Sequence, residues 1–424
     1  MSTASTTTYD VVDPGRWPDV VNVPQHRLRA VTARRLVMHA VRSLPLVVVL
    51  PGGARLGGGR PGDPTMRLVR PHDFFARLGA GGLIGFGEAY MAGDWESDDL
   101  SGVLTVLANR LSTLVPPSLQ RLRGLAVPHR PGGDQNTLHG SRQNVHHHYD
   151  LSNELFETFL DSSMSYSAAL FDADGPATDE SLYDAQQRKT DRLLTVAGVT
   201  AGSRMLEIGT GWGELAIRAA ARGAHVTSVT LSAEQADLAR RRIAAAGFGD
   251  CIDVQLADYR EVTGAFDAIV SAEMIEAVGA DHWDEYFACL HRLLVPGGRA
   301  ALQAITMPHD RMLATMGTYT WILKYIFPGG QLPSVQAVRD HATRAGLAAT
   351  SELAFGASYA ETLRRWRATF EGRADDVDRL GFDATFRRMW SLYLAYSEAG
   401  FRSGYLDVCQ FGLTRASDPS AGHA

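Results

Sequence analysis

The stretches LEIGTGWGEL (residues 206–215) and AHVTSVTLS (residues 224–232) decide the fold of this chain. The first predicts a buried apolar strand, a tight glycine turn and the start of a helix. Glycine lets the backbone pass close to a ligand, and the helix that follows presents free N–H groups to it. The glycines of this turn are Gly209, Gly211 and Gly213. The two stretches therefore predict a strand–loop–helix–strand unit that binds a ligand at its loop.

Further strands and helices alternate beyond this unit. The apolar runs predict strands at residues 203–209, 224–231, 251–258, 266–273 and 299–306, and helical segments separate most of them. Strands and helices in this order form a parallel, doubly wound sheet. Such sheets bind their ligands beyond the carboxyl ends of the strands. The fold class predicted for this part of the chain is therefore α/β.

The second stretch ends in Thr230, Leu231 and Ser232, without the acidic residue that commonly binds a ribose in nucleotide-binding folds. A glycine turn alone is a weak signal, because NAD-binding proteins use a similar one. Two features favour S-adenosylmethionine: the GTGWG spacing, and the Asp258-Tyr259 pair at the place where methyltransferases contact adenine. A dinucleotide enzyme and another kind of α/β protein remain alternatives at this point.

Length and composition predict the domain organisation. The 424 residues suffice for two or three domains, and a Pro- and Gly-rich stretch predicts a linker at residues 131–144. We expect a smaller α+β domain at residues 1–130 and an α/β domain at residues 145–424. The three cysteines have no metal-ligand or disulfide-framework spacing, and the N-terminus lacks the pattern of a secretory signal. These features favour a cytoplasmic protein.

The net charge of −6 conceals an asymmetry. Residues 1–140 carry 15 Arg and 11 acidic residues, and the rest of the chain carries 26 basic and 36 acidic ones. Residues 26–44 are helix-like and mix arginines with apolar residues, which predicts either a solvated helix face or a cationic helix that binds anionic lipid. Nucleic acid is a poor fit, because the overall charge is negative and no recognised motif is present.

Several blocks of the sequence, spread along nearly the whole chain, carry a resemblance to a known family. They are GLIGFGEAYMAGDW (82–95), HYDLSNELFETFLDSSMSYSAALF (148–171), LEIGTGWGEL, VTLSAEQ, EMIEAVG (273–279), TWILKYIFPGGQLPS (320–334) and YLAYSEAGFRSGYLDVCQF (393–411). In this order they resemble the cyclopropane fatty acid synthase family. The resemblance is closest to the actinobacterial branch that converts oleoyl chains to 10-methylene-stearoyl chains, the precursors of tuberculostearic acid.

The resemblance implies a Rossmann-like class I methyltransferase with a helical acyl-binding insert at about residues 307–360. It also implies the roles of individual residues. The cofactor-binding residues would be Tyr166, Ser167, Glu207, Gly209, Gly211, Gly213, Thr230, Leu231, Gln235, Asp258 and Tyr259, with Gln235 at the ribose. The catalytic residues around the transferred methyl would be Tyr149, Glu276, Gln303, Ile305 and Tyr359.

The chain departs from the family pattern at the base. Cyclopropane synthases of the family hold a bicarbonate with a Cys and two His side chains, whose positions here carry Ala168, Ala277 and Gln303. The loss of a thiol and two imidazoles puts bicarbonate binding in doubt, although Gln303 can still donate a hydrogen bond. We expect slower ring closure and a methylene product as a result.

The expected function is therefore methyl transfer from S-adenosylmethionine to an oleoyl chain of a phospholipid, at the inner face of the cell membrane. A cyclopropane synthase, a small-molecule methyltransferase and an inactive lipid-binding protein are the alternatives. A separate reductase would saturate the methylene product, and an oligomer is compatible with the sequence. No metal is expected, because the side chains of the consecutive residues 146–148, all histidines, point in different directions and the family needs none.

Overall fold

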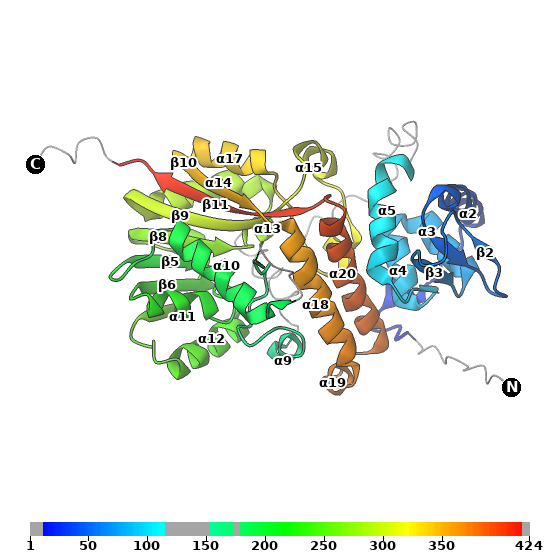
Figure 1. Ribbon diagram of the computed structural model, residues 1–424, viewed down its shortest axis with the longest axis horizontal. Helices are drawn as coiled ribbons and strands as arrows, with labels where there is room; N and C mark the ends of the chain where they lie inside the picture. Colours follow the sequence, from blue (N-terminus) through cyan, green and yellow to red (C-terminus); the bar gives the residue numbers. More distant parts are fainter. Residues whose placement is uncertain (1–11, 115–151, 173–178, 418–424) are drawn as a thin grey trace, which may run out of the picture. The chain divides into compact units, whose positions relative to one another are not determined.

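A computed structural model describes residues 12–114, 152–172 and 179–417 (Figure 1). The chain forms two compact units: an N-terminal unit of Met1–Val127 with Trp366–Ser403, and a sheet unit of Pro128–Arg365 with Gly404–Ala424. The sequence analysis placed residues 366–403 in the second domain, whereas in the structure these residues belong to the N-terminal unit. The division at residues 131–144 itself lies outside the described residues and stays a prediction.

A seven-stranded sheet forms the centre of the sheet unit, in the order β10-β11-β9-β8-β5-β6-β7. The predicted doubly wound parallel sheet is confirmed, because β5 to β9 pair in parallel. Strand β11 runs antiparallel to both of its neighbours, a feature that we did not predict. The strands are β5 (Arg204–Ile208), β6 (His225–Thr230), β7 (Ile252–Leu256), β8 (Phe266–Ala272), β9 (Leu294–Thr306), β10 (Leu347–Ala354) and β11 (Asp407–Arg415).

Helices cover both faces of this sheet because successive strand residues point to opposite sides. Met205 of β5 packs in the core with α10, α11 and α12, while Leu206 packs in the core with α14 and α17 (Figure 1). Serine side chains cap α10, α12 and α17 at their first turns. The bounds are α10 (Leu182–Val196), α11 (Glu214–Ala221), α12 (Ala233–Ala245), α14 (Trp283–Leu293) and α17 (Val335–Arg344).

Short helices occupy the loops at the carboxyl ends of the strands and in the predicted insert. The insert region holds two of them between β9 and α17, followed by strand β10. These elements are α9 (Asn153–Glu157), η3 (Tyr259–Glu261), α13 (Ile275–Val278), η4 (Ala280–His282), α15 (His309–Thr315) and α16 (Trp321–Tyr325); α18 (Gly356–Gly372) follows β10 and runs on into the N-terminal unit.

The N-terminal unit combines a four-stranded sheet, in the order β2-β1-β3-β4, with helices, which confirms the predicted α+β class. Helix α20 packs against α4 and α5 within this unit. No helix in the described ranges is long and apolar enough to cross a membrane. The elements are α1 (Pro18–Val21), α2 (Arg27–Ala40), η1 (Val41–Ser43), β1 (Val47–Val49), β2 (Arg55–Leu56), β3 (Thr65–Leu68), α3 (Pro71–Gly81), α4 (Leu83–Ala92), β4 (Trp95–Glu96), α5 (Leu100–Leu114), α19 (Ala374–Arg379) and α20 (Ala384–Arg402).

Candidate active site

The glycine loop joins β5 to α11 at the carboxyl end of β5. Its glycines have positive φ angles of 96° at Gly209, 51° at Gly211 and 89° at Gly213, a conformation that other residues rarely adopt. A Cβ on Gly209 would lie 2.6 Å from Met274 Cγ, whereas a Cβ on Gly211 would meet no atom of the described residues within 4 Å. Gly209 therefore lets the segment after β8 approach the loop, and Gly211 borders open space at a helix N-terminus, where a nucleotide-like ligand fits.

Aromatic side chains hold residues 152–167 against the glycine loop. The Trp212 Nε1 atom donates a hydrogen bond to Asn153 Oδ1 over 2.7 Å, and the Trp212 ring lies 4.9 Å from that of Phe156. The Tyr166 ring meets Phe156 edge-on at 5.0 Å. The structure thus places Tyr166 at the loop side of the sheet, where the resemblance implies a cofactor contact.

The residues expected at the ribose and adenine lie at the ends of the neighbouring strands. Thr230 and Gln235 are both buried and share a hydrogen bond of 3.2 Å between Thr230 Oγ1 and Gln235 Oε1; Leu231 follows Thr230. Asp258 is buried, and Arg260 donates to both of its carboxylate oxygens. The Asp258 carboxylate therefore fixes its own loop. An adenine contact by Asp258 and Tyr259 stays a prediction.

Two buried titratable groups lie beneath the glycine loop. Glu207 accepts a hydrogen bond from Ser228 Oγ, which also contacts Thr210 Oγ1, and burial raises the pKa of Glu207 to about 8. Lys189 Nζ donates to Ser167 Oγ over 2.6 Å, and burial lowers the pKa of Lys189 to about 8. The structure thus places two predicted cofactor residues, Glu207 and Ser167, in an interior polar layer.

Glu276 lies in α13, directly after β8 and the short connection 273–274. The Ile305 backbone N–H donates to Glu276 Oε1 over 2.5 Å, so the structure brings these two predicted catalytic residues together. The buried Oε2 atom of Glu276 has no hydrogen-bond partner among the described residues. Burial raises the pKa of Glu276 to about 8, and the charge of Glu273 adds to this shift. A carboxylate oxygen without a hydrogen-bond partner among the described residues, such as Glu276 Oε2, suits a site that receives a positive charge.

Glu273 is the centre of a second cluster, which the sequence analysis missed. Its Oε1 atom accepts hydrogen bonds from the Ala168 backbone N–H over 2.9 Å and from Gln303 Nε2 over 2.8 Å. Its Oε2 atom accepts one from the Tyr359 hydroxyl over 2.6 Å. Burial raises the pKa of Glu273, although these hydrogen bonds and Lys189 oppose the shift. Two residues with predicted catalytic roles, Gln303 and Tyr359, thus contact this carboxylate.

Two consecutive hydrogen bonds between side chains fix the orientation of Gln303. Its Oε1 atom accepts a hydrogen bond of 2.9 Å from Gln410 Nε2, and Gln410 Oε1 accepts one of 2.6 Å from Arg192. Gln303 must therefore present its amide N–H groups to Glu273. The EMIEAVG block contains both glutamates, and the end of a parallel strand was the available signal for Glu273.

Two predicted features, Tyr149 and the histidines at residues 146–148, lie outside the residues that the structure describes. Within those that the structure describes, no three His, Cys, Asp or Glu side chains are grouped so that they could hold a metal ion.

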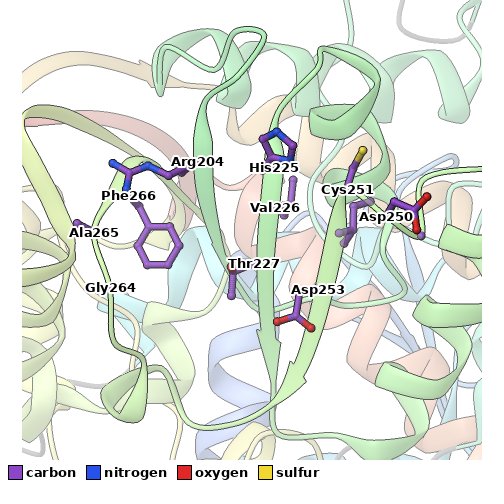
Figure 2. Close-up of a pocket in the computed structure, with 12 residues that line it drawn as sticks. Arg204, His225, Val226, Thr227, Asp250, Cys251, Asp253, Gly264, Ala265 and Phe266 are labelled. Atoms are coloured by element: carbon purple, nitrogen blue, oxygen red, sulfur yellow. The ribbon is translucent and has the colours of Figure 1, made fainter.

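A hollow lies at the opposite edge of the sheet (Figure 2). Arg204, His225, Ile252 and Phe266, the first residues of β5, β6, β7 and β8, line it together with loop residues such as Asp250. The glycine loop follows the last residue of β5, so it lies at the other end of these strands. Because parallel α/β sheets bind ligands at their carboxyl ends, we place the candidate active site at the glycine loop and not in this hollow.

Comparison with known proteins shows which proteins the chain is similar to. The model of the mycolic acid cyclopropane synthetase family matches residues 136–411. The chain is 53% identical to tuberculostearic acid methyltransferase UfaA1 of Mycobacterium tuberculosis, over 96% of this chain and 97% of that protein. It is 33% identical to cyclopropane-fatty-acyl-phospholipid synthase of Escherichia coli, over 86% of this chain and 90% of that protein.

Solved structures confirm the predicted Rossmann-like methyltransferase fold. The mycolic acid cyclopropane synthase CmaA1, complexed with SAH and CTAB, superposes with a TM-score of 0.59 at 31% identity, covering 68% of this chain and 99% of that one. The cyclopropane synthase MmaA2 from Mycobacterium tuberculosis gives the same TM-score at 30% identity, covering 65% of this chain and 98% of that one.

Proposed function

The chain belongs to the mycolic acid cyclopropane synthetase family, and on this premise we propose that it methylates the double bond of an oleoyl chain in a phospholipid. The product would be a 10-methylene-stearoyl chain. The observation that carries this proposal is the pair of buried carboxylates, Glu273 and Glu276, that follows β8 beside the glycine loop. A methyltransferase for oxygen or nitrogen has no need of two such groups, whereas a carbocation on a lipid needs negative charge nearby.

The glycine loop fits S-adenosylmethionine, because Gly211 borders open space and the loop opens a helix. When bound, this cofactor supplies an electrophilic methyl group. Gly209, Gly211, Thr230 and Gln235 would hold it. The Lys189–Ser167 hydrogen bond would keep the segment with Tyr166 in place.

The chain's own residues must then make an unreactive alkene react. They have to exclude water and hold the double bond in position. Glu276 Oε2, which has no hydrogen-bond partner among the described residues, offers negative charge to the developing cation. The Tyr359 ring offers an aromatic face of the kind that attracts cations. A hydride shift followed by loss of a proton from the new methyl group gives the exocyclic methylene.

Ring closure is the second candidate outcome, and the similarity to the Escherichia coli cyclopropane synthase favours it. It differs only in the last step, because direct loss of the proton closes a three-membered ring. The methylene product contains a new C=C bond, so its conversion to a methyl branch requires a separate reductase.

The substrate would be reached at a membrane surface. Helix α2 has no buried residue, and it exposes Leu28 (86%), Val31 (50%) and Leu36 (48%) beside arginines. The insert region likewise exposes Leu313 and Met316. Exposed apolar residues beside basic ones favour binding of the protein to an anionic lipid surface as a peripheral protein.

The test is mass spectrometry of lipids from cells that express the chain, with a Glu276→Gln variant as the control. We expect an oleoyl-derived product heavier by one CH2, which ozonolysis cleaves at the methylene group. A product of the same mass that resists ozonolysis would establish ring closure instead. The absence of any heavier acyl chain, in cells where the protein accumulates, would refute methylation of lipid.

A further inference from the structure

We propose that the carboxylate of Glu273 is the base that takes the departing proton, so that the chain supplies this group itself. The inference rests on the proposed function and deepens it by naming the base. It follows from what surrounds Glu273, not from the sequence motifs.

The surroundings of Glu273 form a site built for an anion. The Ala168 N–H, the Gln303 amide and the Tyr359 hydroxyl all donate to this carboxylate, at 2.9, 2.8 and 2.6 Å. The resemblance assigned the positions of Gln303 and Ala168 to an external bicarbonate. In this structure those groups enclose a side-chain carboxylate. A second anion at the same donors would face its negative charge, which makes an external base both unnecessary and disfavoured.

The backbone of Glu273 is strained, so the fold keeps a glutamate at a position where glycine would be more stable. Glu273 has a φ of 54°, in the left-handed region that non-glycine residues rarely occupy. Its N–H donates to the Gln303 carbonyl over 2.7 Å, which holds this conformation in place. Glycine would adopt it without strain. Strained residues that the surroundings enforce are concentrated at functional sites.

The lone pairs of Glu273 leave room for one more proton. A carboxylate has about four acceptor positions, and the three donors occupy two on Oε1 and one on Oε2. The charged and titratable groups that act on it are Lys189, Tyr359 and the neighbouring Glu276. Among the described residues, Glu276 Oε2 has no hydrogen-bond partner and can face the cation, while Glu273 keeps one acceptor position for the proton, so the two glutamates have different roles.

Methyl transfer leaves a cation beside the carbon that bears the new methyl group, and the hydride shift moves the positive charge onto that carbon. A C–H bond of that methyl group breaks, its electron pair forms the exocyclic C=C bond, and the proton moves to Glu273 Oε2. No oxidant or further reactant is needed. The carboxylic acid that results can keep its hydrogen bond with the Tyr359 hydroxyl.

The decisive variant is Glu273→Gly, because glycine tolerates the φ of 54° and the fold should survive. Turnover of oleoyl phospholipid vesicles should fall by ~10²–10⁴-fold, the range that a lost general base produces. Affinity for S-adenosylmethionine by calorimetry should stay within about twofold of the parent value. Sodium formate or bicarbonate should restore much of the lost rate, because the small anion enters the space that the side chain leaves. The matched variant Glu276→Gly should not be restored by either anion.

The outcomes separate this proposal from the proposed function. If the unaltered chain methylates no lipid, the proposed function fails. If it does so and Glu273→Gly works at the parent rate, Glu273 is not the base. A variant that is folded and binds the cofactor, yet is slow and unaffected by formate and bicarbonate, would also overturn the proposal, because it would show a positioning role alone.

Discussion

The glycine loop at residues 209–213 and the acidic segment at residues 273–276 lie at the same edge of one sheet, yet they are specified in different ways. The loop depends on its own backbone: three positive φ angles require glycine, and glycine shows in the sequence. The acidic segment depends on distant partners. Glu273 is bound by residues that lie 105, 30 and 86 positions away along the chain. Local requirements can be recognised in a motif, whereas a cluster of this kind becomes visible only when the chain is folded.

Removal of the Glu276 carboxylate should have a large effect on the rate, and it tests the acidic segment. Replacement by Gln keeps the shape and the contact with Ile305 but removes the negative charge that Glu276 carries once it ionises, so the comparison is made above pH 8. We expect methyl transfer in single-turnover experiments to slow by ~10²–10³-fold, as on removal of one electrostatic group from an active site. Cofactor affinity, measured by calorimetry, should change little. If the rate falls by less than about tenfold, the cation is stabilised elsewhere and the division of roles between the two glutamates is wrong.

A steric change tests the loop in the same way. Gly211→Val should fill the open space at this position and weaken S-adenosylmethionine binding by ~10–100-fold, because an overfilled site costs about 1–3 kcal/mol. Gly202→Val is the matched control, since Gly202 also has a positive φ (79°) and open space, but lies before β5. Both variants share the backbone strain. If the two variants bind S-adenosylmethionine with equal affinity, the cofactor does not bind at the glycine loop.

The sequence predicted the parallel sheet, the glycine loop and Glu276, because apolar periodicity and glycine turns are local signals. It did not predict strand β11 as an antiparallel neighbour of β9, since pairing between distant strands leaves no local pattern. The same reason explains why Glu273 was passed over. Asp258 is the reverse case. The sequence predicted that this residue follows the third strand, but it could not show that Arg260 would donate hydrogen bonds to both oxygens of its carboxylate.

A charge reversal extends the comparison to the surface of the N-terminal unit. Arg34 and Arg35 of α2 are exposed. Each basic residue near an anionic membrane contributes about 1 kcal/mol, so Arg34→Glu with Arg35→Glu should weaken binding to anionic vesicles by ~30-fold or more at low salt. Vesicle sedimentation measures this. The control pair Arg241→Glu with Arg373→Glu changes the same charge at exposed positions outside α2. Similar losses in both pairs would show general attraction and exclude a role specific to α2.

The smallest effect concerns stability, and it compares Glu207 beneath the glycine loop with Glu276 in the acidic segment. Burial raises the pKa of each to about 8. Between pH 5.5 and 7.5 each carboxyl keeps its proton in the folded chain and loses it on unfolding. The folded state therefore binds more protons, and the free energy of unfolding should decrease as the pH rises, by ~1.4 kcal/mol per pH unit for each group. Lys189 acts in the opposite sense only above pH 8, where its lowered pKa lets the folded chain lose a proton that the unfolded chain keeps.

Urea denaturation across this pH range measures the slope. Glu207→Gln and Glu276→Gln should each reduce it by about the contribution of one group, whereas Glu157→Gln, at an exposed carboxylate, should leave it unchanged. If Glu276→Gln flattens the slope and Glu207→Gln does not, the folded chain already holds Glu207 as a carboxylate, paired with buried Lys189. The glycine loop would then rest on an ion pair, and only the acidic segment would carry a neutral acid that must ionise before it can stabilise a cation.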